Sequence, residues 1–372
     1  METRRASRGA VICALFAALV TVAAQVASRR PSFHPSLLLN VAEDQPMAAH
    51  VAALDSSFQL SATTDHYDGV YFLAMALDPF ARGEAHDLID LAAYRYGHPF
   101  YSWLAALLSG GQPGLLAWVF WGLSIASMAG AAAGVALLAH RLGASPWWGL
   151  LVAVSPGLLF SATTALTEPF QVALVSVLLL LWLRPRTHPL LLGVVVVAMC
   201  LTKEQLVLVP FALGLSLLGQ MWRERHVDLE RLGALVAGPV ALGAWLWYVR
   251  GQFTAEQKQY DAGNLHVPGQ GWLEVFDLAG HLRVGEFHAA QIGSTAVPGL
   301  VALAALMVVA AVIGLRRRDE LGLVVVLQAV LISALGWRTL LYPHEMFRIP
   351  SLAVVFACLL IAVELSGRRA RP

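Results

Sequence analysis

Residues 113–139, "PGLLAWVFWGLSIASMAGAAAGVALLA", contain no charged side chain. A helix rises about 1.5 Å per residue, so this stretch is longer than the ~30 Å hydrocarbon core of a bilayer. Across the whole chain 58% of the residues are hydrophobic and 13% are charged, whereas roughly a quarter are charged in a soluble domain. The sequence therefore predicts an all-α integral membrane protein and excludes a soluble enzyme.

Apolar runs recur from one end of the 372-residue chain to the other. Besides 113–139 they cover residues 10–28, 146–162, 167–183, 190–202, 205–220, 232–249, 298–315, 321–341 and 346–365. We expect a polytopic transmembrane bundle of about ten spans in one domain, residues 1–372. The run 10–28 follows a basic start and is interpreted as a spanning helix, with a cleaved signal peptide as the alternative. The run 190–202 is short for a span, so it shares a polar turn with its neighbour or lies where the membrane thins.

Arginine-rich segments separate successive pairs of these runs. They are "METRRASR" (1–8), "HRLGAS" (140–145), "RPRTH" (184–188), "WRERHVDLER" (222–231), "RRRDE" (316–320) and "GRRARP" (367–372). Positively charged turns are typical of the cytoplasmic side, so an even number of spans should separate each pair of them. Five helical hairpins satisfy this rule. Arg29 and Arg30 are the exception, because they follow the first span on the other side.

This rule on even numbers of spans, the parity argument, also predicts five polar turns on the extracytoplasmic side of an inner (plasma) membrane. They cover residues 29–112, 163–170, 201–205, 251–297 and 342–350. These turns hold nearly every charged residue outside the basic segments, so we expect a polar site on that side. Residues 98–109 are too few to span and are predicted to form a surface or re-entrant helix. The loop 251–297 could cover the site as a lid.

Other classes of site are disfavoured. The net charge is +1 and no basic face accumulates, which argues against a nucleic-acid partner. Three isolated cysteines in apolar runs form neither a disulfide framework nor a CxxC metal site, and we interpret them as packing residues; they are Cys13, Cys200 and Cys358. The loop histidines His266, His281 and His288 match no zinc signature. Gly130 and Gly134 form a GxxxG pattern, which predicts close helix packing.

The stretch "DHYDGVYF" (65–72) gathers two carboxylates ahead of an apolar run. A carboxylate at a membrane surface can act as a general base toward a hydroxyl, and we expect Asp68 to do so. Asp65, His66 and Tyr71 are expected to contact substrate around it. A solvated loop with an aspartate helix cap is the alternative. A divalent metal is possible, although two aspartates three residues apart are a weak metal signal. Gly69 would let another backbone approach closely.

Two further outer turns place ionisable residues beside apolar helices. "LTEPF" (166–170) has Glu168 at a helix start, with Thr167 as a possible cap and Pro169 in the first turn; helix capping alone could explain this pattern. Lys203 and Glu204 interrupt about thirty mostly apolar residues. Ionisable groups at that depth are costly and usually functional, so Lys203 is a candidate phosphate ligand with Glu204 as its partner. A tight turn that reaches water is the competing explanation.

The remaining candidates combine aromatic and basic residues. Arg95 stands between Tyr94 and Tyr96, a pattern that suits lipid headgroups or a substrate phosphate. The last outer turn holds His344 and Arg348 four residues apart, which helical spacing would bring together. Arginine binds phosphate oxygens in a bidentate manner, so Arg348 suits a lipid-linked phosphate. Anchoring at the membrane surface is the alternative for both segments.

Together these segments resemble a known family. "YDGVYFLAMALDPF", "YRYGHPFYSWLAALL", "SPWWGLLVAVSPGLLFSATTALTEPF" and "LTKEQLVLVP" are similar to bacterial members of the GT-C superfamily, in the branch associated with cell-surface glycopolymers. A more distant likeness connects the chain to GPI-type mannosyltransferases. The resemblance covers about residues 60–110 and 146–210, with a looser match at the last hairpin. Two features depart from the family: His98 stands where relatives more often have arginine, and no soluble domain follows the last span.

The resemblance implies a polytopic glycosyltransferase that takes a sugar from a polyprenyl-phosphate carrier. By position, Asp68 matches the catalytic acid of the first loop and Glu168 a second acid near the site. Lys203 matches a basic residue near the site, and Arg348 an arginine near the carrier phosphate. The expected partners are a lipid-linked sugar donor, a cell-envelope glycan or lipid acceptor, and membrane lipids. A transporter or flippase for a lipid-linked saccharide is the alternative, and a structural subunit without activity is a third interpretation.

Overall fold

The computed structural model describes residues 2–29, 31–61, 67–184, 186–254, 264–281 and 289–369. Every apolar run predicted from the sequence forms a helix or a broken pair of helices, and the described residues contain no strand beyond two isolated bridges. The helices that contain these runs are α1 (Glu2–Ser28), α6 (Pro113–Arg141), η3 (Pro146–Gly149), α7 (Leu150–Val154), α8 (Pro156–Thr163), α9 (Glu168–Trp182), α10 (Pro189–Thr202), η4 (Glu204–Val207), α11 (Leu208–Glu224), α12 (Leu229–Gln252), α14 (Ala289–Arg317), α15 (Glu320–Ser333), α16 (Trp337–Leu341), α17 (Pro343–Arg348) and α18 (Ser351–Arg369).

Helix length sorts these elements into groups. Within the described ranges, five segments are long and apolar enough to cross a membrane: Ala6–Ser28, Pro113–Arg141, Glu204–Glu224, Leu229–Gln252 and Ser294–Arg317. A sixth is a pair, Pro146–Val154 and Pro156–Thr163, bent by 57°. The break falls at Ser155, because the proline after it favours an extended backbone. Four apolar helices are shorter, α9, α10, α15 and α18. The protein is therefore a helical membrane protein.

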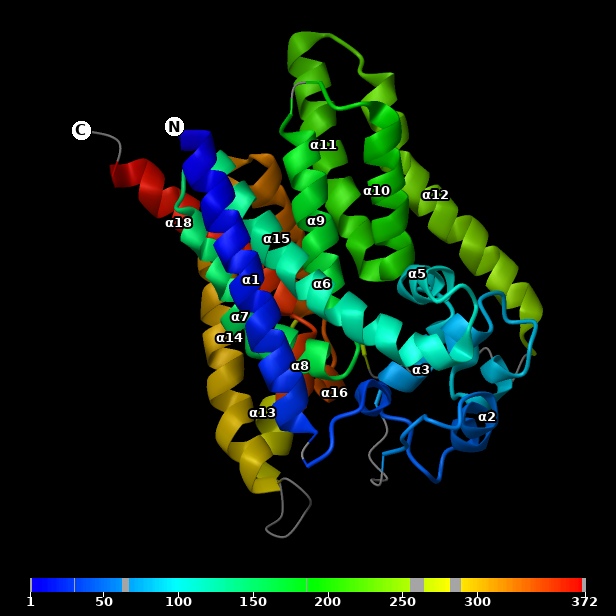
Figure 1. Cartoon of the computed structure of the whole chain (residues 1–372). Helices are drawn as coiled ribbons and strands as arrows, with labels where there is room; N and C mark the ends of the chain where they lie inside the picture. Colours follow the sequence, from blue (N-terminus) through cyan, green and yellow to red (C-terminus); the bar gives the residue numbers. More distant parts are fainter. Residues whose placement is uncertain are drawn as a thin grey trace.

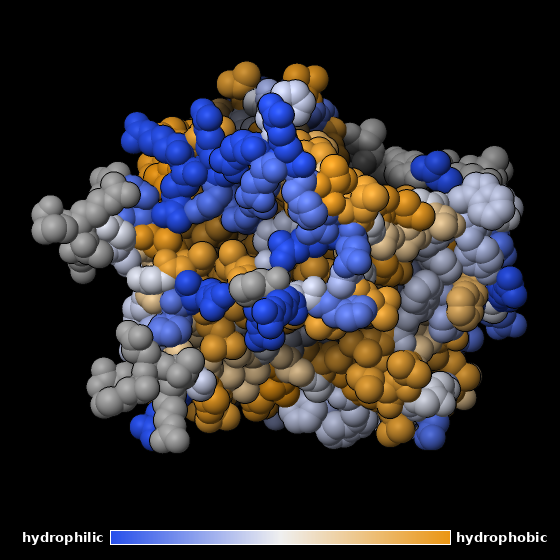
Figure 2. All heavy atoms as spheres, turned by 90° about the horizontal axis from the view of Figure 1, so that it is seen from above, coloured by the Kyte–Doolittle hydropathy of each residue, from blue (hydrophilic) through white to orange (hydrophobic). Residues whose placement is uncertain are grey.

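The basic segments gather at one end of the molecule. Residues in or next to these segments contact one another, and the pairs are Cys13 with Pro146, Arg141 with Leu183, Arg231 with Trp182, Gln220 with Glu320, and Arg317 with Glu364. The start of α1 and the end of α18 lie there, in the upper part of Figure 1, whereas α3 and α13 lie toward the opposite end. Seen from the basic end, hydrophilic residues form a band with hydrophobic surface around it (Figure 2). The parity argument therefore grouped the basic segments correctly in space.

The first outer segment differs from the loop expected from its sequence. It folds into η1 (Pro35–Leu39), α2 (Pro46–Leu54), α3 (Gly69–Leu77), η2 (Ala85–Leu88), α4 (Ala92–Arg95) and α5 (Phe100–Leu108). The predicted helix at 98–109 is α5, but α3 was missed. Its first eight residues are buried, because this short apolar helix packs against α5 and η1. A Cβ on Gly69 would lie 2.8 Å from the Leu39 carbonyl oxygen, so the predicted close backbone approach is confirmed.

Arg29, the exception to the charge rule, is tied to this segment. Its Nη2 donates a hydrogen bond to Asn40 Oδ1 at the end of η1. Arg30 lies outside the described residues. A partner within the protein explains how Arg29 is accommodated in the folded chain, although it follows the first apolar run.

The second large outer segment also contains unpredicted structure. Helix α13 (Gln270–His281) lies within it, and α14 begins at Ala289, nine residues before the predicted run at 298. Trp272 Nε1 donates to the Ile332 carbonyl, 3.0 Å away, and the backbones of Asn264 and Gly336 are also hydrogen-bonded. These contacts hold the segment against α15 and α16. His288 lies outside the described residues.

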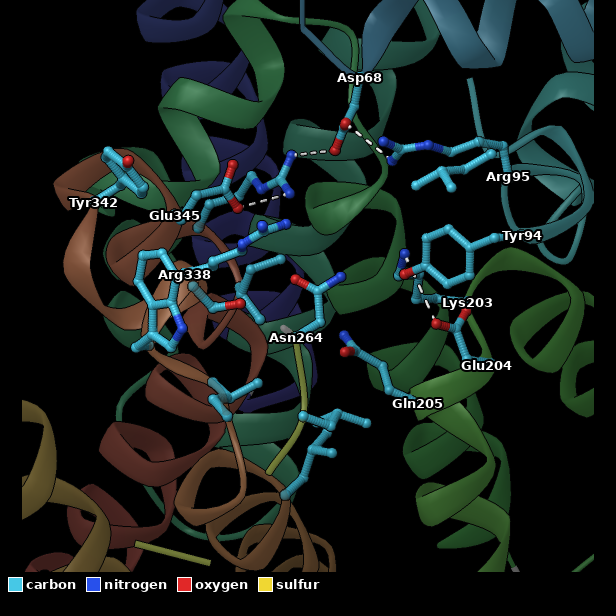
Figure 3. A pocket seen from close by; sticks show the side chains of 18 of the residues that line it. Asp68, Tyr94, Arg95, Lys203, Glu204, Gln205, Asn264, Arg338, Tyr342 and Glu345 are labelled. Carbon is cyan, nitrogen blue, oxygen red and sulfur yellow. Dashed lines mark hydrogen bonds and ion pairs between the residues drawn. The ribbon is translucent and has the colours of Figure 1, made fainter. Parts of the chain in front are cut away.

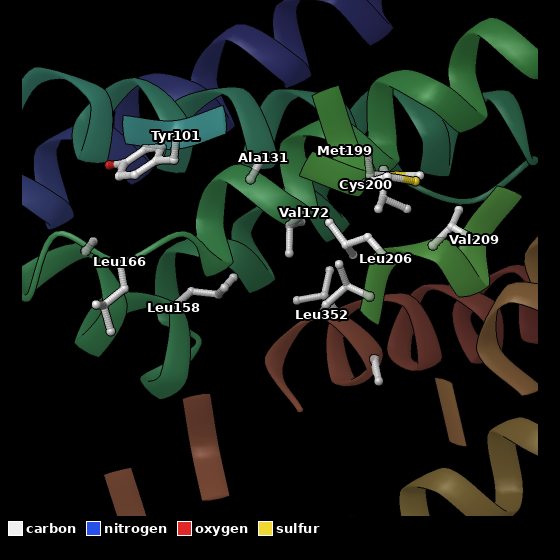
Figure 4. Packing of buried hydrophobic residues seen from close by; sticks show 14 of the residues in the cluster. Tyr101, Ala131, Leu158, Leu166, Val172, Met199, Cys200, Leu206, Val209 and Leu352 are labelled. Atoms are coloured by element: carbon white, nitrogen blue, oxygen red, sulfur yellow. The ribbon is translucent and has the colours of Figure 1, made fainter. Parts of the chain in front are cut away.

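The core fills the space between α6, α9, α10, α11 and α18. Val172, Leu206 and Leu352 are buried there and point toward one another (Figure 4). Gly134 confirms the predicted close packing, because a Cβ at that position would lie 2.6 Å from Ser176 Cβ of α9. The GxxxG face of α6 is thus used within the chain. All three cysteines are free thiols, and Cys13 and Cys200 are buried, as expected of packing residues.

Candidate functional site

All five predicted outer turns meet at the end of the molecule opposite the basic segments. Four of them line one cavity of about 1080 Å³ (Figure 3). The fifth contributes Glu168, which contacts this cluster from behind through Arg348. The charged part of the cavity wall consists of Asp68, Arg95, Lys203, Glu204, Arg338, Glu345 and Arg348. The structure therefore brings these distant turns together around one cavity.

Arg348 is the centre of the charged cluster. Its Nη1 lies 2.8 Å from Asp68 Oδ2 and its Nη2 lies 2.8 Å from Glu345 Oε2. Its Nε lies 3.6 Å from Glu168 Oε1. The Arg348 residue is 7% exposed, so three carboxylates share one buried guanidinium. Burial alone would lower the pKa of Arg348, but Glu345 and Asp68 outweigh it and raise this pKa well above its usual value.

Asp68 lies between two cations. Its Oδ1 accepts a hydrogen bond from Arg95 Nη1 at 3.1 Å, and its Oδ2 accepts one from Arg348. Burial would raise the pKa of Asp68, but Arg348 and Arg95 outweigh that effect and hold it well below its usual range. Asp68 is therefore a carboxylate at neutral pH. While both arginines hold it, it is also a weak base, since a low pKa means low proton affinity.

Aromatic rings hold the two arginines in place. The Arg95 guanidinium carbon lies 3.8 Å from the centre of the Tyr71 ring, in a cation–π contact. The Arg348 guanidinium carbon lies 5.1 Å from the centre of the Tyr67 ring. The Tyr67 hydroxyl donates a hydrogen bond to Glu345 Oε1. Tyr71 is thus a support beneath Arg95, and it lies outside the wall of the large cavity.

Lys203 and Glu204 form a second charged group, on the side of the cavity near α11. Lys203 has an extended backbone between α10 and η4, which confirms the predicted interruption. His98 lies against both residues, with Nδ1 3.2 Å from Glu204 Oε2 and Nε2 3.5 Å from Lys203 Nζ. Burial and Lys203 lower the pKa of His98, so this imidazole is neutral. Burial would lower the pKa of Lys203, but Glu204 outweighs it and raises that pKa.

An apolar wall adjoins these charges. Val207 ends η4 and Leu208 begins α11, while Leu331 and Leu335 come from the end of α15 and the turn after it. The cavity is therefore amphipathic, with ion pairs on one part of its wall and aliphatic side chains on another.

The predicted site residues fall into three groups. Asp68, Arg95, Lys203, Glu204, His344 and Arg348 line the cavity. Glu168 and Tyr71 border the smaller chamber behind it. Asp65 and His66 lie outside the described residues.

Two local contacts were not predicted. Arg348 pairs with Glu345 on its own helix, and the ring of His344, on the same helix, lies near those of Tyr67 and Phe160. Thr167 occupies the predicted cap position of α9, but its side chain makes no cap hydrogen bond and instead accepts one from Gln171.

Sequence reasoning missed several residues of the cavity wall. Arg338 lies within the predicted apolar run 321–341, where it was not singled out. Asn264 lies in the predicted outer turn 251–297, in a stretch without a recognised motif. Gln205 stands next to the Lys203–Glu204 pair, and that position was the available signal for it. Figure 3 shows the side chains of all three directed into the cavity.

A metal centre finds no support in the structure as described. Across the residues with described positions, no group of three or more His, Cys, Asp or Glu side chains could hold a metal ion. Asp65, which entered the sequence argument for a divalent ion, is not among them.

No protein-family model, no curated protein and no solved structure matches this chain.

Proposed function

We propose that this chain is a membrane glycosyltransferase that moves a sugar from a polyprenyl-phosphate carrier to an extracytoplasmic glycan or lipid acceptor of the cell envelope. One observation carries the proposal: Asp68 lies between Arg95 and Arg348 in the wall of an amphipathic cavity. Such a cavity suits a ligand with an anionic head and a hydrocarbon tail. The resemblance to GT-C enzymes agrees with this assignment.

The cations in the cavity wall would bind the carrier phosphate. Arg95, Lys203 and Arg348 all face the cavity, and arginine matches the geometry of phosphate oxygens. The aliphatic wall of Val207, Leu208 and Leu331 would take the first part of the prenyl tail. These cations would also offset the charge that develops on the leaving phosphate, which is where preorganised electrostatics contribute most.

Asp68 would act as the general base toward the acceptor hydroxyl. In the resting site its two arginine contacts keep its proton affinity low. A donor phosphate would compete for the same guanidinium groups, and loss of those contacts would raise the pKa of Asp68 toward the working range of a base. The acceptor oxygen then attacks the anomeric carbon and expels polyprenyl phosphate. A single displacement of this kind inverts the configuration at that carbon.

The first test is the substitution Asp68→Asn. We expect the rate of transfer from a radiolabelled polyprenyl-phosphate sugar in proteoliposomes to fall at least about 100-fold, the lower range for loss of a positioned general base. Glu84→Gln is the matched control, because Glu84 is exposed in the same outer segment and should keep full activity. Equal transfer by wild type and Asp68→Asn, with both folded, would exclude Asp68 as the base. Lipid translocation without a glycosidic product would favour a flippase instead.

The proposal also requires an orientation in the plasma membrane. We expect about ten spans, with the bent pair and the four shorter helices counted among them, and with the basic end in the cytoplasm. In a cysteine-free background, a membrane-impermeant maleimide added outside spheroplasts should label Glu84→Cys but not His226→Cys. Both positions are exposed, in the first outer segment and in the turn between α11 and α12. Labelling of both from the same side would refute the parity argument.

A further inference from the structure

A small chamber lies directly behind Asp68. Its volume is about 20 Å³, and Asp68, Arg95, Lys203 and Arg348 belong both to its wall and to that of the large cavity. Glu168 lies only in the wall of the chamber. A water molecule needs about 10–15 Å³, so the chamber has room for one water, whereas a phosphate or a sugar ring is too large.

Three buried polar atoms belong to residues of this wall. Glu168 Oε2, Arg348 Nε and Arg95 Nε form no hydrogen bond with any described residue. Arg348 Nε lies 3.6 Å from the other carboxylate oxygen, Glu168 Oε1, which is too long for a hydrogen bond. Buried polar groups are normally satisfied, by protein or by ordered water. One water has two donors and two acceptor positions, so it can donate to Glu168 Oε2, accept from Arg348 Nε and keep one acceptor position for a proton.

We propose that this chamber binds one internal water molecule, which accepts a hydrogen bond from Arg348 and donates one to Glu168, and that this water relays the acceptor's proton from Asp68 to Glu168. The relay rests on the function proposed above, whereas the water site does not. As the acceptor oxygen bonds to the anomeric carbon, its proton moves to Asp68. The water takes that proton and gives one of its own to Glu168, while polyprenyl phosphate leaves with the electrons of the broken bond.

The direction of this transfer follows from the charges. After the reaction the two arginines again favour the ionised form of Asp68, because each lies within 3.1 Å of one of its oxygens. Glu168 has one oxygen 3.6 Å from Arg348, and its other oxygen has no described partner. The proton is therefore held better on Glu168 than on Asp68.

Radiolytic labelling tests the water site without reference to activity. Millisecond X-ray exposure turns bound water into hydroxyl radicals, which oxidise a methionine in contact with it. Met75 lines the chamber and is 1% exposed, whereas Met128 of α6 is 0% exposed and borders neither pocket. We expect Met75 to be oxidised several-fold faster than Met128, and Glu168→Leu to reduce the rate at Met75 to that of Met128. Equal rates in the wild type would overturn the proposal.

Glu168→Gln tests the relay, because it keeps a polar group in the chamber but holds no proton for transfer. We expect unchanged labelling of Met75 together with transfer slowed at least several-fold. A plot of the wild-type transfer rate against the D₂O fraction should be curved, as expected when two protons move together. The same plot for the Glu168→Gln variant should be a straight line. A wild-type rate and isotope effect in Glu168→Gln would overturn the relay. Absence of transfer by the wild type itself, with Met75 labelled, would remove the proposed function and the relay together and leave the water site established.

Discussion

Replacing Arg348 by methionine should lower the free energy of unfolding by roughly 3–5 kcal/mol, the usual cost of removing one partner from a buried ion pair. Asp68, Glu168 and Glu345 all lie within 3.6 Å of the Arg348 guanidinium. Methionine has a similar volume but no charge, so these carboxylates would lose their common partner. Reversible unfolding in mixed micelles measures the change. Transfer activity should be lost as well, since Arg348 is a proposed phosphate ligand.

Arg338→Met is the matched control for this substitution. Arg338 lines the same cavity but is exposed, and substitutions of exposed residues usually change stability by no more than about 0.5 kcal/mol. Combining Arg348→Met with Glu168→Gln and Glu345→Gln should recover most of the stability but none of the activity. If Arg348→Met were as stable as Arg338→Met, the charge cluster would have no part in holding the fold.

Gly157→Ala should destabilise the protein by at least about 3 kcal/mol, at the upper end of the usual cost of overpacking. A Cβ on Gly157 would lie 1.8 Å from the Phe347 carbonyl oxygen and 2.9 Å from Arg348 Cα. Both contacts are with backbone, so α8 and α17 must move apart, and Arg348 must move with α17. We therefore expect reduced stability and reduced transfer together, in the same unfolding and transfer assays.

Gly122→Ala provides the comparison within the same chain. Gly122 is exposed in α6, and nothing lies within 4 Å of the position a Cβ would take. Alanine in a helix interior is roughly 0.5–1 kcal/mol more favourable than glycine, so this variant should be as stable as the wild type or slightly more so. Equal behaviour of the two variants would show that α8 and α17 are not packed as described.

Large features of the fold could be predicted because they depend on chemistry that repeats along the chain. Apolar runs gave the helices, and arginine segments such as 222–231 gave the two ends of the molecule. Lys203 and Glu204 indicated a turn, because it costs free energy to place charged side chains within an apolar run in a membrane. Gly69 could be interpreted as a close contact because glycine has no Cβ to keep another backbone away.

The details of the site could not be predicted, because they depend on pairings across long sequence separations. Nothing in the sequence near Asp68 indicates that it pairs with Arg348, 280 positions away. The helix α3 was missed because a nine-residue apolar run is too short to span and its burial depends on neighbours. Arg338 escaped notice because an arginine near the end of an apolar run is ordinary in a membrane helix.

The Asp68–Arg348 ion pair joins residues 280 positions apart in the chain. Synthesis and insertion proceed from the N-terminus, so Asp68 and Glu168 are already present long before Arg348 leaves the ribosome. Until the last hairpin is added, the nascent protein carries the acids without their principal cation. A chain that stops before α17 therefore has uncompensated carboxylates and an incomplete cavity wall. The charged cluster and the cavity wall are completed together, when α17 is added.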